Sequence, residues 1–388
     1  GALALAMASD GVLSADDVNT VLQEKKQAVR KSGLLEYVDT DIDLTGVGGL
    51  DNLKRWLRRR DNSWLAEAAE YGIPAPRGVL ITGVPGCGKS LTAKAVAASW
   101  RLPLLRMEDG FIRSVGLGSN LVPPLSLVTD DMGIYFNAKT PSRLEHILQN
   151  QNFDDQDFQT ALKLQKMLTE NHISKYNVGN SDFTAPSTDK TVILVPGQVE
   201  DDASIRYGSP QIYCNLDLLR TVRERHPDAY IIYKPHPDVV SGNRIGHISS
   251  EDTARYADQT AEQADILTCL LYADEVHTMT SLTGFEALLR GKKVSCYGLP
   301  FYAGWGLTQD LLPIPRRSRR LELWQLIAGT LIHYPDYIHP ETHQAINAET
   351  AAQILIRQKN MQKNNNGLHR GYFAKKLGKI KQLYRSFK

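Results

Sequence analysis

The stretch Thr191-Val192-Ile193-Leu194-Val195-Pro196-Gly197-Gln198 joins an apolar run rich in β-branched residues to a sharp Pro-Gly turn. A short apolar run bounded by turn residues predicts a buried strand that ends at residue 195. Outward from this strand, similar apolar runs alternate with segments of helical pattern. The expected strands are 229–233, 275–279 and 293–297, and the expected helices are 211–225, 252–265 and 284–290. This alternation predicts an α/β fold with a parallel, doubly wound sheet.

Polar residues directly follow three of these strands: Gln198, Lys234-Pro235-His236-Pro237, and Thr280-Ser281. Because the carboxyl ends of parallel strands meet at one edge of a sheet, we expect the three loops to line one crevice. A histidine, hydroxyl groups and the backbone N–H groups that open a helix suit a nucleotide phosphate. Taken alone, His236 also fits a rigid turn with an exposed ring, and Ser281 also fits a simple helix N-cap.

A second informative stretch, Glu108-Asp109-Gly110-Phe111-Ile112-Arg113-Ser114, follows an apolar run at 102–107. It places two adjacent carboxylates at a strand end, where open α/β sheets hold their ligands. Adjacent strand residues point to opposite faces, so only one carboxylate faces a ligand unless the loop bends, which Gly110 permits. Such a pair is compatible with nucleophilic or acid–base chemistry and equally with a solvated loop.

The stretch Gly83-Val84-Pro85-Gly86-Cys87-Gly88-Lys89-Ser90 matches the P-loop pattern in full. It lies between an apolar run and a helical segment, which is the context that this motif requires. Glycines at these positions let backbone N–H groups turn toward a phosphate, while the lysine meets the outer phosphates and the serine binds magnesium. The pattern predicts Mg-ATP binding by Gly83, Gly86, Gly88, Lys89 and Ser90, with Ser90 as the expected magnesium ligand.

Residues 1–102 resemble the start of an AAA ATPase of the Ycf type, on the P-loop and on the stretches 21–26, 32–37 and 46–54. An AAA motor also needs an acidic strand, a polar sensor and an arginine finger. We find none of them in the hundred or so residues after the P-loop. The run Leu270–Glu275 looks like the acidic strand but lies too late in the chain. An AAA-type ATPase is therefore an alternative interpretation rather than the leading one.

From about residue 103 to residue 388 the chain resembles the capsule-polysaccharide β-Kdo transferases of the KpsC type. The resemblance rests on the segments 108–114, 234–238 and 280–286, and on the long stretches 195–202 and 297–308. It implies a GT-B arrangement, in which two Rossmann-like domains face each other. It also implies transfer of Kdo from CMP-β-Kdo to a glycolipid or oligosaccharide acceptor with retention of configuration, without a further cofactor.

Retention implies two displacements, the first by an enzyme carboxylate. On the positions that match the family, Asp109 is the expected nucleophile and Glu108 the partner that tunes it or takes the acceptor proton. The resemblance also implies a set of donor-binding residues: His236, Pro237, Lys234, Ser281, Thr280, Glu286, Gln198 and Arg206. His236 and the hydroxyl pair are expected at the CMP phosphate and Glu286 at the ribose. Lys234 or Arg206 is expected at the carboxylate of the sugar.

We therefore interpret the chain as a chimera of two families joined near residues 101–107. A natural fusion, an assembly error and a deliberate recombinant would give the same sequence. The expected segments are a helical lead-in and linker (1–77), a P-loop β-α-β unit that replaces part of the first transferase domain (78–107), the remainder of that domain with a helical connector (108–176), a Rossmann-like donor domain (191–345) and a basic tail (346–388). If the replacement breaks the cleft, the chain is an inactive composite that only binds nucleotide.

The tail carries an excess of positive charge. The 388 residues have a net charge of +2, yet the segment from Arg357 onward holds ten Lys and Arg and no acidic residue. Phe373, Leu377, Ile380, Tyr384 and Phe387 recur in it at helical spacing. This pattern predicts a basic amphipathic helix on an anionic membrane surface, with a capsule assembly protein as a rival partner and no nucleic acid. Four scattered cysteines and no apolar run of membrane-spanning length favour a cytoplasmic protein at the inner face of the inner membrane.

Four smaller predictions depend on local pattern. His277 lies on an apolar strand and is expected to be a buried core histidine rather than a ligand. The run Arg316-Arg317-Ser318-Arg319-Arg320 fits either an anionic acceptor site or a solvated charge run. Residues 133–137 are expected to form a strand and residues 53–60 a helix.

Overall fold

The computed structural model describes residues 46–60, 63, 70, 88–100, 107–116, 122–130, 132–177, 183–242 and 244–365. The chain divides into two compact units, which are described separately. The N-terminal unit comprises Gly1–Met107 with Thr129–Asp131, and the C-terminal unit comprises Glu108–Val128 with Met132–Lys388. Residues 83–87 of the P-loop, the stretches 21–26 and 32–37, and the basic segment 366–388 lie outside the described residues.

The N-terminal unit contains helices α3 (Asp51–Arg59) and α5 (Lys89–Ser99). Helix α3 has an acidic residue in its first turn and two arginines in its last, which complements the helix dipole. Its Trp56 contacts Trp100, which ends α5, with ring centroids 5.9 Å apart. Gly88 precedes α5 with φ +84°, a conformation that residues with a side chain rarely adopt.

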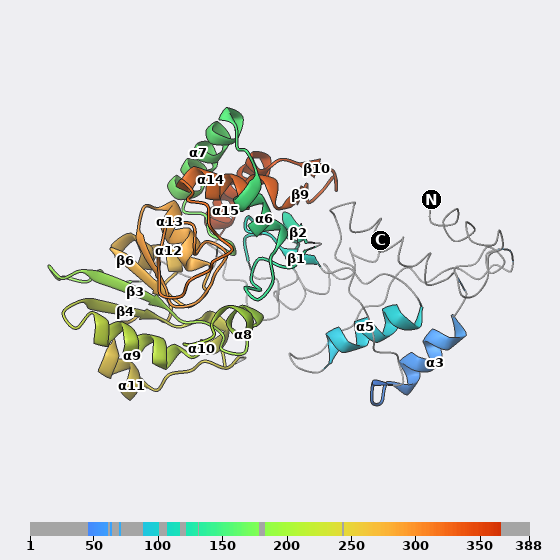
Figure 1. The fold of residues 1–388 in the computed structure, drawn as a ribbon, viewed down its shortest axis with the longest axis horizontal. Coiled ribbons are helices and arrows are strands. Elements are labelled where there is room, and N and C mark those ends of the chain that lie inside the picture. Colours follow the sequence, from blue (N-terminus) through green and yellow to red (C-terminus); the bar gives the residue numbers. More distant parts are fainter. Residues whose placement is uncertain are drawn as a thin grey trace. The chain divides into compact units, whose positions relative to one another are not determined.

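A six-stranded parallel sheet forms the centre of the C-terminal unit (Figure 1). Its strands are β3 (Val192–Pro196), β4 (Tyr230–Lys234), β5 (Gln259–Thr260), β6 (Glu275–Thr278), β7 (Lys293–Cys296) and β8 (Gln309–Asp310). The spatial order is β5-β4-β3-β6-β7-β8, which is the Rossmann order with its reversal between β3 and β6. Ligands of such sheets bind outside the carboxyl ends of the two strands at the reversal.

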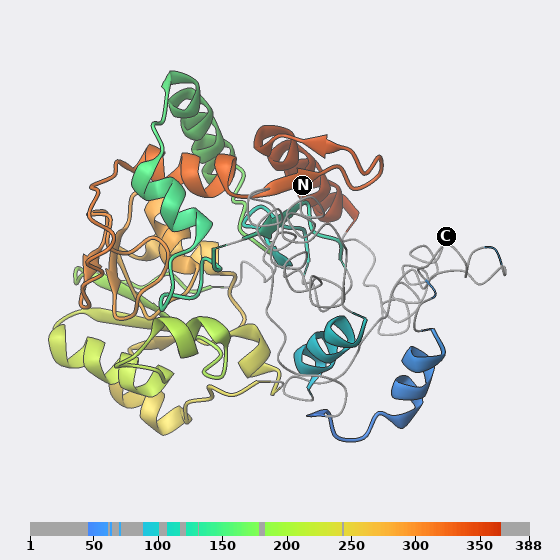
Figure 2. The ribbon, with the colours of Figure 1, turned by 45° about the vertical axis from the view of Figure 1, so that its right-hand side comes forward.

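Helices cover both faces of this sheet, and the alternation of side chains along β3 shows how. Ile193 and Val195 belong to a core shared with α9 (Asn215–Arg225). Val192 and Leu194 point the other way, into a larger core that includes residues of α12 (Ile266–Tyr272) and α13 (Thr283–Leu289). Every residue of β3 is buried, as expected for a central strand of a doubly covered sheet. The two helix layers are visible on opposite sides of the strands in Figures 1 and 2.

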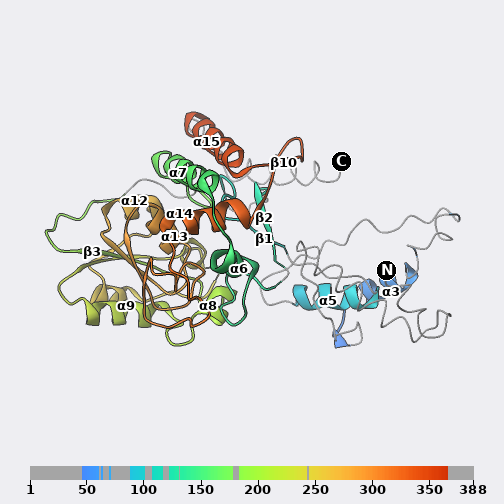
Figure 3. The same ribbon diagram turned by 45° about the horizontal axis from the view of Figure 1, so that its top comes forward.

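Further helices complete the C-terminal unit: α6 (Arg143–Asn150), α7 (Asp155–Glu170), α8 (Ala203–Gly208), α10 (Pro237–Val240), α11 (Ser250–Tyr256), α14 (Leu323–Ile327), a π-helical turn (Ala328–His333) and α15 (Ala348–Asn365). Asp154 and Asp157 form a capping box that fixes the start of α7. Helices α7 and α15 lie side by side (Figure 3) and are joined by an ion pair between Lys163 and Glu349.

A second sheet has the order β1-β2-β9-β10, from β1 (Met107–Asp109), β2 (Ser126–Thr129), β9 (Asp336–Ile338) and β10 (Ala345–Ile346). Strand β9 pairs antiparallel with both neighbours, Ser126 opposite Tyr337 and Ala345 opposite Ile338. The strand that ends at Asp109 thus pairs with a sheet built partly from residues more than 200 positions later.

Three details of the predicted elements are wrong. Residues 133–137 form turns rather than a strand, because Tyr135 packs on Phe111 from a loop and the strand lies earlier, in β2. The helix expected at 252–265 is only α11, and β5 follows it. The helix expected from residue 211 begins at Asn215, where α9 starts.

The α/β class and the parallel sheet are confirmed. The described residues contain one parallel sheet of Rossmann order, and the GT-B pair of such domains stays a prediction. Among the described helices, none combines the length and the apolar character needed to cross a bilayer.

Candidate functional site

The structure brings the loops after β3 and β6 together through Gln198. This side chain is 7% exposed. Its Nε2 donates to Thr280 Oγ1 and its Oε1 accepts from the backbone N–H of Thr280, both at 2.9 Å. The loop after β4 joins them, since the N–H of Gly197 donates to the carbonyl of Lys234 at 2.8 Å. The three loops predicted to share one crevice therefore meet at the point where the strand order reverses.

Ser281 lies directly before α13 in a tightly held turn. Its N–H donates to Thr278 Oγ1 at 3.1 Å, and its hydroxyl donates to Thr283 Oγ1 at 3.0 Å. Its carbonyl accepts a hydrogen bond from Tyr302 Oη at 2.5 Å. A Cβ atom at Gly284 would lie 2.2 Å from that same Tyr302 hydroxyl, so only glycine allows this close approach.

His236 caps the short helix α10, with Pro237 at its first position. Its Nδ1 accepts a hydrogen bond from the N–H of Asp238 at 3.2 Å, and its side chain is 38% exposed. Burial lowers the pKa of His236, although the carboxylate of Asp238 acts in the opposite direction. A neutral ring whose Nδ1 accepts carries its proton on Nε2, which is then available as a donor toward the crevice.

The two residues expected at the sugar carboxylate differ in their surroundings. Lys234 is 6% exposed, and its ammonium donates to the carbonyls of Pro235 and Glu262 at 3.2 and 3.0 Å. Burial lowers the pKa of Lys234. Arg206 lies on α8 and is exposed. Lys234 therefore holds its own loop together, while Arg206 faces solvent.

Asp109 ends β1 and is held by a buried arginine. Arg113 Nε donates to Asp109 Oδ2 at 2.5 Å, and Arg113 is 4% exposed whereas the Asp109 side chain is 34% exposed. Arg113 Nη1 also donates to Ser114 Oγ at 2.5 Å. A Cβ at Gly110 would lie 2.3 Å from Ser126 Oγ, so the chain passes close to β2 directly after the carboxylate. Glu108, the other carboxylate, is partly buried in β1.

The Asp109 loop and α13 are connected through Lys175. The N–H of Ser114 donates to the carbonyl of Lys175 at 3.3 Å, and the N–H of Lys175 donates to Glu286 Oε1 at 3.1 Å. Phe111 adds packing contacts with Phe285 at 6.1 Å between ring centroids. The loop that carries the predicted nucleophile is therefore bound to the helix that follows the predicted phosphate loop.

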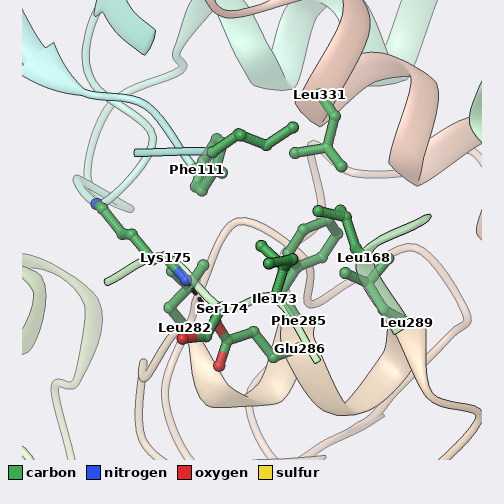
Figure 4. Close-up of a pocket in the computed structure, with 11 residues that line it drawn as sticks. Phe111, Leu168, Ile173, Ser174, Lys175, Leu282, Phe285, Glu286, Leu289 and Leu331 are labelled. Atoms are coloured by element: carbon green, nitrogen blue, oxygen red, sulfur yellow. Dashed lines mark hydrogen bonds between the residues drawn. The ribbon is translucent and has the colours of Figure 1, made fainter. Parts of the chain in front are cut away.

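A small cavity lies between these segments (Figure 4). Its volume of about 20 Å³ suffices for a water molecule and excludes a sugar nucleotide. Glu286, which is 8% exposed, lines it, and burial raises the pKa of this carboxyl. The cavity is a packing gap, and the loops at the carboxyl ends of β3, β4 and β6 are the candidate site.

Arg113 and Lys175 were not among the residues predicted for the site. The signal that marks the second is Asn177, which adopts φ +53°, a region that asparagine tolerates. Its amide donates to the carbonyl of Ser114 at 3.1 Å. An asparagine three residues after a serine is a recognisable turn pattern, but nothing local shows that this turn contacts residue 114.

The arginine run at 316–320 has a different role from both expectations. Arg316 and Arg317 bind Glu145 of α6, with Nε–O distances of 2.5 and 2.8 Å. Arg317 also donates to the carbonyls of Pro300 and Ala303 at 2.6 and 2.7 Å. Arg316, Arg317 and Arg319 therefore bind other segments of the fold, and most of the run is not simply solvated.

The P-loop is described only at its end. Gly88 precedes α5, Lys89 is the first residue of that helix, and Ser90 is helical. Gly83 and Gly86 lie outside the described residues. Within the described part of the chain, no group of three or more His, Cys, Asp or Glu residues is placed to hold a metal ion.

Comparison with known proteins identifies the two parts of the chain. The family model described as capsule polysaccharide biosynthesis protein matches residues 87–185 and 168–337. The chain belongs to this family. It is 92% identical over 303 residues to the capsule polysaccharide modification protein LipA of Neisseria meningitidis serogroup B, a match of 78% of this chain and 43% of that protein. The chain thus spans less than half the length of LipA.

Two solved structures are similar to the C-terminal part of this family member. The β-Kdo 2,7 transferase KpsC of Thermosulfurimonas dismutans is 45% identical with a TM-score of 0.57, covering 66% of this chain and 77% of that chain. The β-Kdo 2,4 transferase KpsC of the same organism is 36% identical with a TM-score of 0.63, covering 71% and 86%. The fold is therefore the one that these transferases share.

The beginning of the chain matches a different family. Residues 1–32 match the second domain of a SpoVK-like AAA ATPase. The AAA domain-containing protein ycf46 of Trieres chinensis is 42% identical over 104 residues, 27% of this chain and 21% of that protein. The matches to LipA and ycf46 together exceed the length of the chain, so they overlap, and the LipA match extends upstream of residue 103. The predicted chimera of two families is confirmed.

Proposed function

We propose that this family member is a glycosyltransferase of capsular polysaccharide biosynthesis that transfers Kdo from CMP-β-Kdo to a glycolipid or oligosaccharide acceptor. The observation that carries the proposal is the meeting of loops at the strand-order reversal, where Gln198 joins the loop after β3 to the loop after β6. Both similar structures are of β-Kdo transferases, which supports the same reaction here. The GT-B pairing of domains is part of the proposal.

The donor phosphate is proposed to bind at the two outer loops of this site. His236 offers the N–H of Nε2, because its Nδ1 already accepts a bond from Asp238. The hydroxyl of Thr280 accepts from Gln198 and keeps its own proton for the phosphate. Ser281 is the proposed second hydroxyl, which exchanges its bond to Thr283 Oγ1 for one to the phosphate, and Glu286 is the proposed partner of the ribose.

The reaction is proposed to proceed by two displacements. A carboxylate oxygen of Asp109 attacks the anomeric carbon, the bond to the phosphate oxygen breaks, and CMP leaves with that electron pair. The acceptor hydroxyl then attacks the same carbon and displaces Asp109, while its proton passes to Glu108. Two inversions give net retention. Arg113 keeps the attacking carboxylate in one orientation through the 2.5 Å bond to Oδ2.

We infer that the linkage formed is 2,7. Sequence identity to the β-Kdo 2,7 transferase is 45%, against 36% to the 2,4 transferase, although the TM-score is slightly higher for the latter. Acceptor position depends on side chains more than on the path of the backbone, so identity is the better guide. NMR analysis of the product measures the linkage, and a 2,4 linkage would contradict this inference.

The place of action is proposed to be the inner face of the inner membrane. A glycolipid acceptor lies in a membrane, and the cations of residues 366–388 would each contribute roughly 1 kcal/mol near an anionic lipid surface. Capsule assembly proteins are the rival partner for this segment. Binding to anionic vesicles that is lost on deletion of residues 366–388 supports the membrane.

Mg-ATP binding at the P-loop is a second candidate function. It is favoured by the left-handed Gly88 that precedes a helix opening at Lys89, and by the match to ycf46. Phosphate release from ATP that disappears in Lys89→Ala would support it.

The leading proposal is tested by incubating the protein with CMP-β-Kdo and a Kdo-terminated glycolipid. We expect release of CMP together with a lengthened glycolipid of retained configuration, and neither product from Asp109→Ala. CMP binding without turnover would identify the inactive composite instead, and Lys89-dependent phosphate release without CMP release would identify the ATPase.

A further inference from the structure

We propose that the ammonium group of Lys175 binds the carboxylate of the donor sugar and thereby selects sugar acids over neutral sugars. The inference rests on the proposed function, since it concerns the sugar that is transferred. The sequence had led us to expect Lys234 or Arg206 at the carboxylate of the sugar, and Lys175 belongs to neither of their segments.

Two hydrogen bonds fix the backbone of Lys175 between α13 and the loop that carries Asp109. Its N–H binds Glu286 on α13 at 3.1 Å, and its carbonyl accepts from Ser114 in the Asp109 loop at 3.3 Å. A sugar whose anomeric carbon meets Asp109 and whose phosphate meets Ser281 must lie between these two segments. We therefore expect residue 175 to lie next to the reacting carbon of the sugar rather than next to the nucleotide.

The side chain of Lys175 extends away from Glu286 and the cavity (Figure 4). Its Nζ lies 6.0 Å from the ring centroid of Phe111 and 5.6 Å from that of Tyr176. Aromatic faces hold an ammonium group without neutralising its charge. Burial raises the pKa of Tyr176, so this ring stays uncharged. Within the described residues, the Lys175 ammonium forms no ion pair with a carboxylate.

The neighbouring cations are already engaged. Arg113, whose guanidinium lies 5.7 Å from the centroid of the same Tyr176 ring, is bound to Asp109 at 2.5 Å. Lys234 donates to two carbonyls of its own loop. Lys175 is thus a partly buried cation beside the loop that carries the proposed nucleophile, and its charge is still available.

The chemistry of the reaction requires such a charge. In Kdo the carboxylate is attached directly to the anomeric carbon, so an anionic nucleophile must approach a carbon that carries a second anion. Repulsion between two like charges at this distance is strong in a partly desolvated site. A cation beside the two carboxylates offsets this repulsion. A neutral sugar would leave the ammonium of Lys175 without a carboxylate partner.

Lys175→Met removes the charge and keeps the aliphatic stem. Affinities for CMP and for CMP-β-Kdo are measured by calorimetry in an Asp109→Asn background, which cannot form the ester. We expect the variant to bind CMP-β-Kdo at least about tenfold more weakly, as loss of one charged partner implies, while CMP binding changes less than about twofold. Lys175→Arg should retain more of the affinity for CMP-β-Kdo.

Lys139→Met is the matched control, because this exposed lysine also lies over a tyrosine ring, 5.4 Å from the centroid of Tyr207. It should change neither affinity. Equal weakening of CMP and CMP-β-Kdo by Lys175→Met would show a structural role and overturn the inference, as would unchanged affinity for both. If the protein with Lys175 intact binds CMP but not CMP-β-Kdo, the proposed function itself fails.

Discussion

His277 shows what a single buried side chain contributes at the residue scale. It lies on β6 with 1% exposure, its Nδ1 3.1 Å from Tyr297 Oη and its Nε2 3.3 Å from Glu275. Burial lowers its pKa to about 4, against 6.5 in the unfolded chain. The unfolded state therefore binds more protons below pH 6.5, and folding stability falls as the pH drops through this window to about 4.

We expect His277 to account for a loss of about 2.5 kcal/mol between pH 7.5 and pH 4.5, out of at most about 3.5 kcal/mol at roughly 1.4 kcal/mol per pKa unit. Urea unfolding at pH 7.5 and at pH 4.5 measures the loss in the natural sequence. In His277→Gln the difference between the two pH values should shrink by that amount, even though the variant is less stable overall. An unchanged pH dependence in the variant would contradict the assignment.

Predictions for single residues succeeded where the neighbouring sequence alone indicates the surroundings of the side chain. His277 was expected to be a core histidine because its strand is apolar, and this is confirmed. Lys175 and Arg113 were missed, because their importance depends on partners elsewhere, in one case Glu286, 111 positions away. The roles of the remaining site residues stay predictions, and the structure adds only which of them it brings together.

At the scale of elements, the buried ion pairs of Glu145 join α6 to the segment 300–317. Glu145 and Arg317 are each 7% exposed. Arg317→Met would leave the carbonyls of Pro300 and Ala303 without their donor and the carboxylate with one partner fewer. We expect a loss of about 3–5 kcal/mol in the free energy of unfolding, as for other broken buried pairs.

Arg320→Met is the control within the same run, since Arg320 is exposed. It should change the free energy of unfolding by less than about 0.5 kcal/mol, as surface substitutions do. Urea denaturation of both variants makes the comparison. Equal effects of the two substitutions would show that the run acts only through its overall charge.

Element prediction worked best for strands buried on both faces. β3 and β4 follow from nearly continuous apolar runs, since neither face meets water. The strands β5, β8, β9 and β10 have two or three residues each and leave almost no periodic signal. Their places depend on pairing with distant strands, which one sequence does not reveal.

On the scale of the whole molecule, we expect sugar transfer by the transferase part to be independent of nucleotide binding at the P-loop. All strands and loops of the proposed donor crevice belong to the C-terminal unit, whose sheet has its own cores. Lys89→Ala should therefore leave CMP release from CMP-β-Kdo within about twofold of the natural chain, because Lys89 belongs to the other compact unit. Lys94→Ala, on the same helix, is the control. A large loss of CMP release in Lys89→Ala alone would tie the P-loop to sugar transfer.

The most direct test of the central claim is the intact mass of the protein after incubation with CMP-β-Kdo without an acceptor. We predict a gain equal to one Kdo residue in the natural chain and no gain in Asp109→Ala. Arg113→Lys should form the adduct more slowly, because a shorter-reaching point charge replaces the guanidinium that orients Asp109. An adduct of the same mass in Asp109→Ala, or none in the natural chain while CMP is released, would contradict a covalent mechanism at Asp109.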